Sequence, residues 1–122
     1  MGLDTTHGAW NGPYSSFMNW RVWLAKKQGF NLKDMEGFGG SNEWTEEMQG
    51  ADYYPLLNHS DCDGELTPLE CFRTVQFLAI ILENKPNDKD LDFESKQQYE
   101  RCERFMKGCQ KAITQQESIE FH

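Results

Sequence analysis

Residues 59–70 form the closest grouping of side chains able to bind a metal ion, and they read His-Ser-Asp-Cys-Asp-Gly-Glu-Leu-Thr-Pro-Leu-Glu. Oxygen donors recur at nearly alternate positions, and Gly64 can supply the sharp turn that would bring them around one point. A hard cation such as calcium is bound by six to eight oxygen atoms. The segment therefore predicts one divalent-cation site with these ligands: Asp61, Asp63, Glu65, Thr67 and Glu70.

This segment resembles the twelve-residue calcium loop of EF-hand proteins, and the similarity extends over about residues 53–84. The resemblance implies side-chain ligands from Asp61, Asp63 and Glu70. It also implies a carbonyl ligand from Glu65, and a Thr67 ligand that acts directly or through water. Calcium is then the expected ion, and a small binding module with one divalent-cation site is the first function that the sequence predicts.

His59 departs from this pattern, because an Asp is expected at the first position of a calcium loop. An imidazole nitrogen is a poor ligand for a hard cation and a good one for zinc, manganese or another transition metal. We therefore expect His59 to be a weak ligand or to face a neighbouring pocket. If His7, His59 and Asp61 converged instead, they could bind such a metal and activate water, which would make the protein a metal-dependent hydrolase. In a third interpretation the loop binds no ion and its carboxylates cap the following helix.

A different hypothesis rests on the aromatic residues near the start of the chain. A flat ligand such as a nucleotide could be held by His7, Trp10, Tyr14 and Trp44, with Asp4 and Cys62 as further candidate contacts. Cys62 could also act as a nucleophile with His7 or His59 as its base, although the adjacent carboxylates oppose the thiolate that this chemistry needs.

Composition limits the partners and the compartment. The chain has 122 residues and a formal net charge of −8, which disfavours binding to a nucleic-acid backbone. There is no signal-peptide pattern, and the longest apolar run, residues 77–82, is too short to cross a bilayer. The four cysteines match no zinc-finger spacing and are expected to be reduced. We expect a soluble, cytoplasmic protein that binds a small molecule or a protein partner, with no nucleic acid and no membrane; the oligomeric state is left open.

The hydrophobic pattern predicts a mainly α fold in one domain over residues 1–122, with three to four helices. Pro13 is expected in the first turn of a helix that ends near Lys27. Residues 69–84 are apolar on nearly every face, which predicts a buried central helix, and residues 93–115 show a regular apolar stripe. Between them we expect a surface loop over 31–50 with a helical turn near 44–48, and a short helix over 53–58 capped by Asp52.

The two ends of the chain are expected to meet. Ile119 and Phe121 alternate with polar residues, as one side of a strand does, and a partner strand around Leu3 would make a small two-stranded ribbon that joins the termini.

The whole chain also resembles a family of small bacterial and phage proteins that has no assigned activity. The segments that carry the resemblance are Gly2-Leu3-Asp4…His7, Gly12-x-Tyr14-Ser15-x-Phe17, His59-Ser-Asp-Cys-Asp-Gly64 and Glu117-x-Ile119-x-Phe121. The resemblance implies a self-contained protein of bacterial or phage origin and carries over no catalytic roles. In a phage, a small-molecule binder could sequester a host defence signal and so act as a counter-defence factor.

Overall fold

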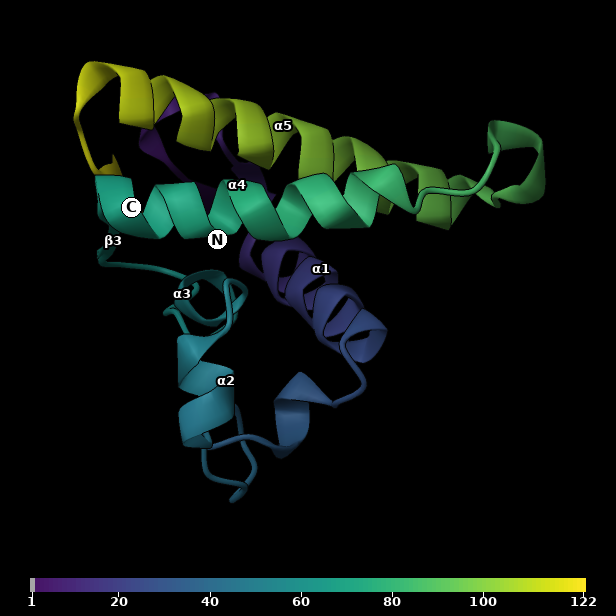
Figure 1. Ribbon diagram of the computed structural model, residues 1–122, viewed down its shortest axis with the longest axis horizontal. Helices are drawn as coiled ribbons and strands as arrows, with labels where there is room; N and C mark the ends of the chain where they lie inside the picture. Colours follow the sequence, from purple (N-terminus) through teal and green to yellow (C-terminus); the bar gives the residue numbers. More distant parts are fainter. Residues whose placement is uncertain (1) are drawn as a thin grey trace.

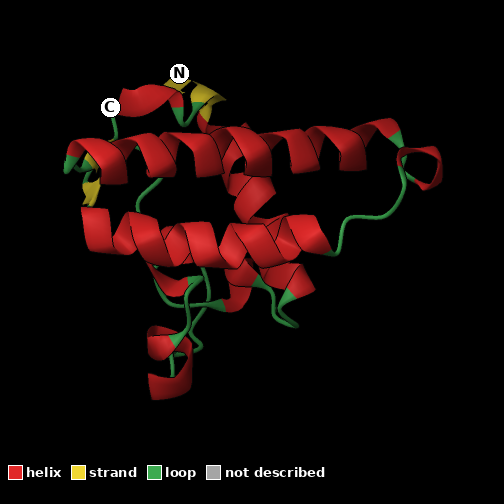
Figure 2. Cartoon of the chain, turned by 45° about the horizontal axis from the view of Figure 1, so that its top comes forward, coloured by secondary structure: helices red, strands yellow, loops and turns green. Residues whose placement is uncertain are grey.

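The computed structural model describes residues 2–122 and confirms the mainly α-helical class. Helices α4 (Pro68–Glu83) and α5 (Phe93–Gln115) lie side by side as an antiparallel pair, and α1 (Tyr14–Lys27) crosses beneath them (Figure 1). The short helices α2 (Glu46–Gly50) and α3 (Tyr54–Leu57) lie on the opposite side of α4 from α5 (Figures 1 and 2). In residues 2–122 no helix is long and apolar enough to cross a membrane.

Helix α4 is central, as predicted, but it is not buried on every side. It begins with a capping box in which Thr67 and Glu70 exchange hydrogen bonds, and Pro68 takes its first position, where a missing N–H costs nothing. One stripe of the helix faces solvent, since Leu69, Phe72 and Ile80 are 70%, 52% and 57% exposed. The apolar pattern alone could not show that the neighbouring helices cover only part of the circumference.

The core is built around aromatic residues that α1 and α5 bring together. Trp20 packs on Trp10 with ring centroids 5.4 Å apart, and on Phe105 at 5.3 Å. Phe17 lies 5.1 Å from Trp10, edge to face. Such pairs add stability beyond the area that they bury. The aromatic face of α1 is therefore core, and Trp10 is part of the same core.

Within residues 2–122, four short strands connect the ends of the chain to its middle. Strand β1 (Gly2–Asp4) pairs with β2 (Asn11–Pro13), and β3 (Glu65–Leu66) pairs with β4 (Ile119–Glu120), both antiparallel. A bridge between Thr5 and Phe121 joins the two ribbons. The predicted meeting of the termini is confirmed, although β4 pairs with residues 65–66 rather than with Leu3.

Some predicted boundaries and caps differ from the structure. Pro13 is the N-cap of α1 and lies outside its first turn, while Asp52 does not cap α3, whose N-cap is Tyr53 with no side-chain hydrogen bond. The 31–50 segment contains α2 and a 3-10 helix at Leu32–Asp34. An aromatic cluster, which holds this segment against the rest of the chain, consists of Phe30, Phe38, Trp44, Tyr53 and Tyr54.

Candidate functional site

Two of the predicted calcium ligands, Thr67 and Glu70, are hydrogen-bonded to each other in the structure. An oxygen of the Glu70 carboxylate accepts the Thr67 backbone N–H at 2.9 Å, and the Thr67 hydroxyl accepts the Glu70 N–H at 3.2 Å. These bonds satisfy N–H groups at the start of α4 that no helical carbonyl can reach. Glu70 thus caps the helix, as the third interpretation of the loop expects of a carboxylate, and Thr67 caps it with its hydroxyl.

The His59 ring lies inside the loop. Its Nδ1 is 2.7 Å from the Ser60 carbonyl oxygen, and its Nε2 is 2.9 Å from the carbonyl oxygen of Glu65. The Glu65 carbonyl is one of the predicted calcium ligands. A neutral imidazole can donate to only one of these acceptors, whereas a protonated ring donates to both. The ring also lies on Phe121, with centroids 4.2 Å apart.

Within residues 2–122, no group of three or more His, Cys, Asp or Glu side chains is placed to hold a metal ion. The structure therefore does not gather His7, His59 and Asp61 into one cluster. Metal binding in the 59–70 loop, with calcium, zinc or manganese, stays a prediction.

Arg21 is a buried charge that the sequence reasoning missed. Its guanidinium donates to the carbonyl of His59, with longer contacts of 3.4 and 3.5 Å to those of Leu56 and Leu57, and it lies 4.5 Å from the centre of the Phe17 ring. Burial lowers the pKa of Arg21 to about 10, and the nearby carboxylate of Asp61 opposes the shift. The signal was present, because Arg21 follows Phe17 by four residues and so falls on the core face of the helix.

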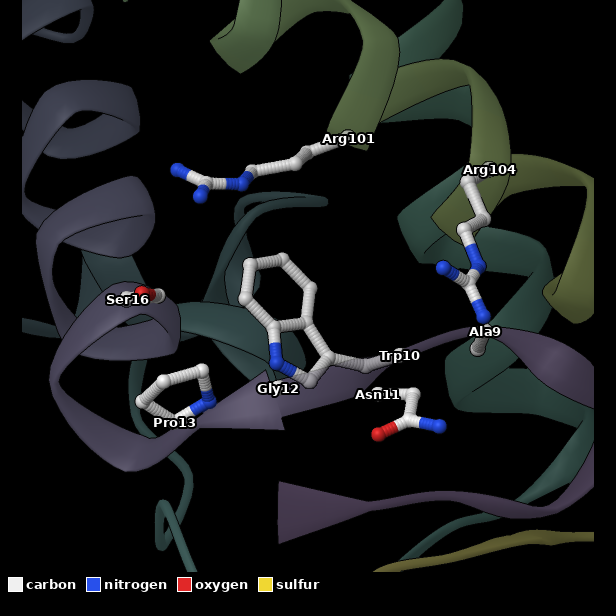
Figure 3. Close-up of a pocket in the computed structure, with 8 residues that line it drawn as sticks. All are labelled: Ala9, Trp10, Asn11, Gly12, Pro13, Ser16, Arg101 and Arg104. Atoms are coloured by element: carbon white, nitrogen blue, oxygen red, sulfur yellow. The ribbon is translucent and has the colours of Figure 1, made fainter. Parts of the chain in front are cut away.

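Trp10 forms the wall of a small pocket between β2 and α5 (Figure 3). The pocket has a volume of about 110 Å³ and is lined by Ala9, Trp10, Asn11, Gly12, Pro13, Ser16, Arg101 and Arg104. The indole N–H of Trp10 is buried and has no hydrogen-bond partner among the described residues. None of the described residues that line the pocket carries a carboxylate.

Two arginines from successive turns of α5 flank this indole, as Figure 3 shows. The Arg101 guanidinium lies 5.4 Å from the centre of the Trp10 ring and donates through Nη1 to Gln98 at 2.9 Å. Arg104 donates through Nε to the Gly8 carbonyl at 3.0 Å. Each guanidinium is anchored by one bond and keeps further N–H donors for a ligand.

His7 takes part in a different set of contacts. Its Nδ1 lies 2.8 Å from the Thr6 hydroxyl, and its Nε2 lies 2.8 Å from the Glu117 carboxylate. The backbone of His7 is left-handed, with φ of 62°, a region that non-glycine residues seldom occupy. Glu117 was not among the predicted site residues, and only the approach of the chain ends reveals it.

The other predicted contacts of a flat ligand are not among the described residues that line the Trp10 pocket. Trp44 packs against Phe38 and Tyr54 and donates its indole N–H to the Glu36 carbonyl at 3.2 Å, so it belongs to a cluster separate from that of Trp10. The remaining predicted residues are the half-buried Tyr14 at the start of α1, the exposed Asp4 in β1, and the exposed thiol of Cys62.

Comparison with protein-family models, with curated proteins and with solved structures gave no match. The resemblance to the bacterial and phage family, and to EF-hand loops, therefore stays a prediction.

Proposed function

We propose that the protein binds a small oxyanion, such as inorganic phosphate or the phosphate group of a larger molecule, in the Trp10 pocket. The observation that carries the proposal is the pair of guanidinium groups, Arg101 and Arg104, that line the pocket with Trp10, while no described lining residue carries a carboxylate. The proposal is a narrower form of the predicted small-molecule binder. It keeps Trp10 as a ligand contact and leaves out Trp44, which lies in another aromatic cluster.

The donors in the pocket favour an anion, since no described lining residue opposes them with a carboxylate. Arginine guanidinium groups present several N–H donors in a fixed plane, which matches the oxygens of phosphate or carboxylate. The positive charge of these two arginines lies around the pocket, whereas the whole chain carries a formal net charge of −8.

The size of the pocket decides how much of a ligand can enter. Sites for whole drug-sized molecules occupy roughly 300–1,000 Å³, and this pocket has a volume of about 110 Å³. It therefore accommodates one oxyanion group, and the base and sugar of a nucleotide would remain outside it.

Calorimetric titration with inorganic phosphate tests the proposal. We expect Arg101→Gln and Arg104→Gln each to weaken binding about tenfold or more, which corresponds to about 1.4 kcal/mol. Lys96→Gln is the matched control, because Lys96 is an exposed cation on the same helix and does not line the pocket. Thermal unfolding of each variant checks that the loss of binding does not come from a loss of folding. Absence of phosphate binding, or an equal loss in the Lys96 variant, would contradict the proposal.

A further inference from the structure

We propose that Thr6 is a nucleophile for acyl transfer, activated by His7, with Glu117 as a positioning residue. This second site is independent of the Trp10 pocket. It rests on a continuous chain of hydrogen bonds from hydroxyl to imidazole to carboxylate, in which both links are 2.8 Å long.

The tautomer of His7 sets the direction of these hydrogen bonds, which form a relay from Thr6 to Glu117. The Thr6 oxygen accepts the backbone N–H of Glu120 at 3.0 Å, which uses one of its two lone pairs. If Nε2 of His7 carries the proton and donates to Glu117, Nδ1 must accept the Thr6 O–H. One lone pair of the Thr6 oxygen then remains for attack on a carbonyl carbon. This is the division of roles between nucleophile, base and orienting group that activates hydroxyl nucleophiles elsewhere.

The surroundings hold the imidazole in this position. Only 8% of the His7 side chain is exposed, and the left-handed backbone at φ 62° directs it between its two partners. Uncommon backbone conformations of this kind persist only where the surrounding structure fixes them. Close packing supplies that constraint next to His7, because the backbone of Ala9 lies directly against Gly108 of α5.

A cavity of about 440 Å³ opens beside the relay and is lined by Thr6, His7, Glu65, Glu117, Ser118 and Glu120. Its volume falls in the range of roughly 300–1,000 Å³ that is usual for small-molecule sites. Its three glutamates repel anionic molecules, so the expected acyl donors are neutral or positively charged esters. The ligand class differs from that of the Trp10 pocket, which we expect to take anions.

The proposed reaction is hydrolysis of an ester in two steps. The Thr6 oxygen bonds to the ester carbonyl carbon while its proton passes to Nδ1 of His7; the carbon–oxygen bond to the alcohol then breaks, and the alcohol leaves with that proton. Water next attacks the acyl-threonine, again giving a proton to His7. The acid departs, and the Thr6 oxygen recovers the proton.

The experiment uses p-nitrophenyl acetate and a Cys62→Ser background, because the exposed Cys62 thiol would itself be acetylated. We expect release of p-nitrophenolate and an acetyl group on Thr6, located by peptide mass spectrometry. His7→Asn should lower the rate of Thr6 acetylation at least tenfold, since Asn tolerates the left-handed backbone but cannot act as the base.

Further variants separate chemistry from folding. Thr6→Ser should keep the acetylation and Thr6→Val should abolish it at this position. Glu117→Gln should lower the rate and move the midpoint of the pH–rate profile to lower pH, which a purely structural role for Glu117 would not do. Acetylation confined to lysines, or a rate at Thr6 that His7→Asn leaves unchanged, would overturn the proposal.

Discussion

The Nε2 atom of His59 lies 2.9 Å from the carbonyl oxygen of Glu65, so a side chain of the loop contacts the oxygen that a calcium ion would need. Replacing His59 with Asp should release this carbonyl and supply the acidic first ligand that a calcium loop requires. We expect His59→Asp to bind calcium at least about tenfold more tightly than the natural protein, measured by calorimetry on metal-free samples.

A second variant checks that such binding uses the loop. Adding Glu70→Gln to His59→Asp should remove the gain, because the last position of a calcium loop needs both carboxylate oxygens. Equal calcium affinity in the His59→Asp variant and the natural protein would show that the loop is not a latent calcium site.

Arg21 is a buried charge that contacts the start of the 59–70 loop. Its replacement tests what that contact contributes to stability. Arg21→Met keeps much of the side-chain volume but leaves the His59 carbonyl without its donor. We expect the free energy of unfolding to fall by about 1–3 kcal/mol, the cost of an acceptor that loses its hydrogen bond in a partly buried place. The value should lie near the lower end, since removal of a buried charge also removes its desolvation cost. Chemical denaturation measures the change, and Lys26→Met, at an exposed position on the same helix, should change stability by less than about 0.5 kcal/mol.

Gly108 of α5 packs directly against the N-terminal segment. A Cβ atom at this position would lie 2.6 Å from the Cβ of Ala9 and 2.7 Å from its Cα. Gly108→Ala should therefore lower the free energy of unfolding by about 1–3 kcal/mol, despite the better helix propensity of alanine. Gly50→Ala is the control, because a Cβ there meets nothing within 4 Å. Equal stability of Gly108→Ala and Gly50→Ala in thermal unfolding would contradict the close contact between Gly108 and Ala9.

Because the thiol of Cys102 is buried, we expect the folded protein to lose stability at alkaline pH. Burial raises its pKa to about 12, whereas the ordinary value is 9.0. Above about pH 9 the unfolded chain loses the proton while the folded chain keeps it, so the contribution of this thiol is complete below pH 9 and is lost as the pH rises towards 12. The expected loss is about 1.4 kcal/mol per pH unit in that window.

Urea unfolding near pH 8 and near pH 10 would measure this effect. Cys102→Ala should have the smaller difference between the two conditions, because other titrating groups act equally in both proteins. The same difference in Cys102→Ala and in the natural protein would contradict the role of the buried thiol.

The sequence was informative where structure depends on near neighbours. The predicted limits of α5 agree with the structure because Asp92 caps it through the Ser95 N–H at 2.7 Å, and the apolar stripe runs to its end. The three-residue spacing of Phe17 and Trp20 likewise favours one helical face, and both residues are buried. These signals lie within a few residues of one another and need no knowledge of the fold.

The candidate sites depend on contacts between distant parts of the chain, which one sequence does not specify. Trp10 was identified as an aromatic contact, but its partners Arg101 and Arg104 lie on the last helix and looked like ordinary exposed charges. The resemblance to a calcium loop used residue types alone, and it could not show that the His59 ring turns inward against Phe121.

The hydrogen bonds between the N-terminal and C-terminal segments of the chain bear on the order in which its parts fold. The relay joins residues separated by 110 positions, and the Glu120–Thr6 bond spans 114. Contacts of such long range carry a large loop-closure entropy, so they are expected to form after the α4–α5 pair and to open before it. We therefore expect Thr6, His7 and Glu117 to come together after the two long helices have paired.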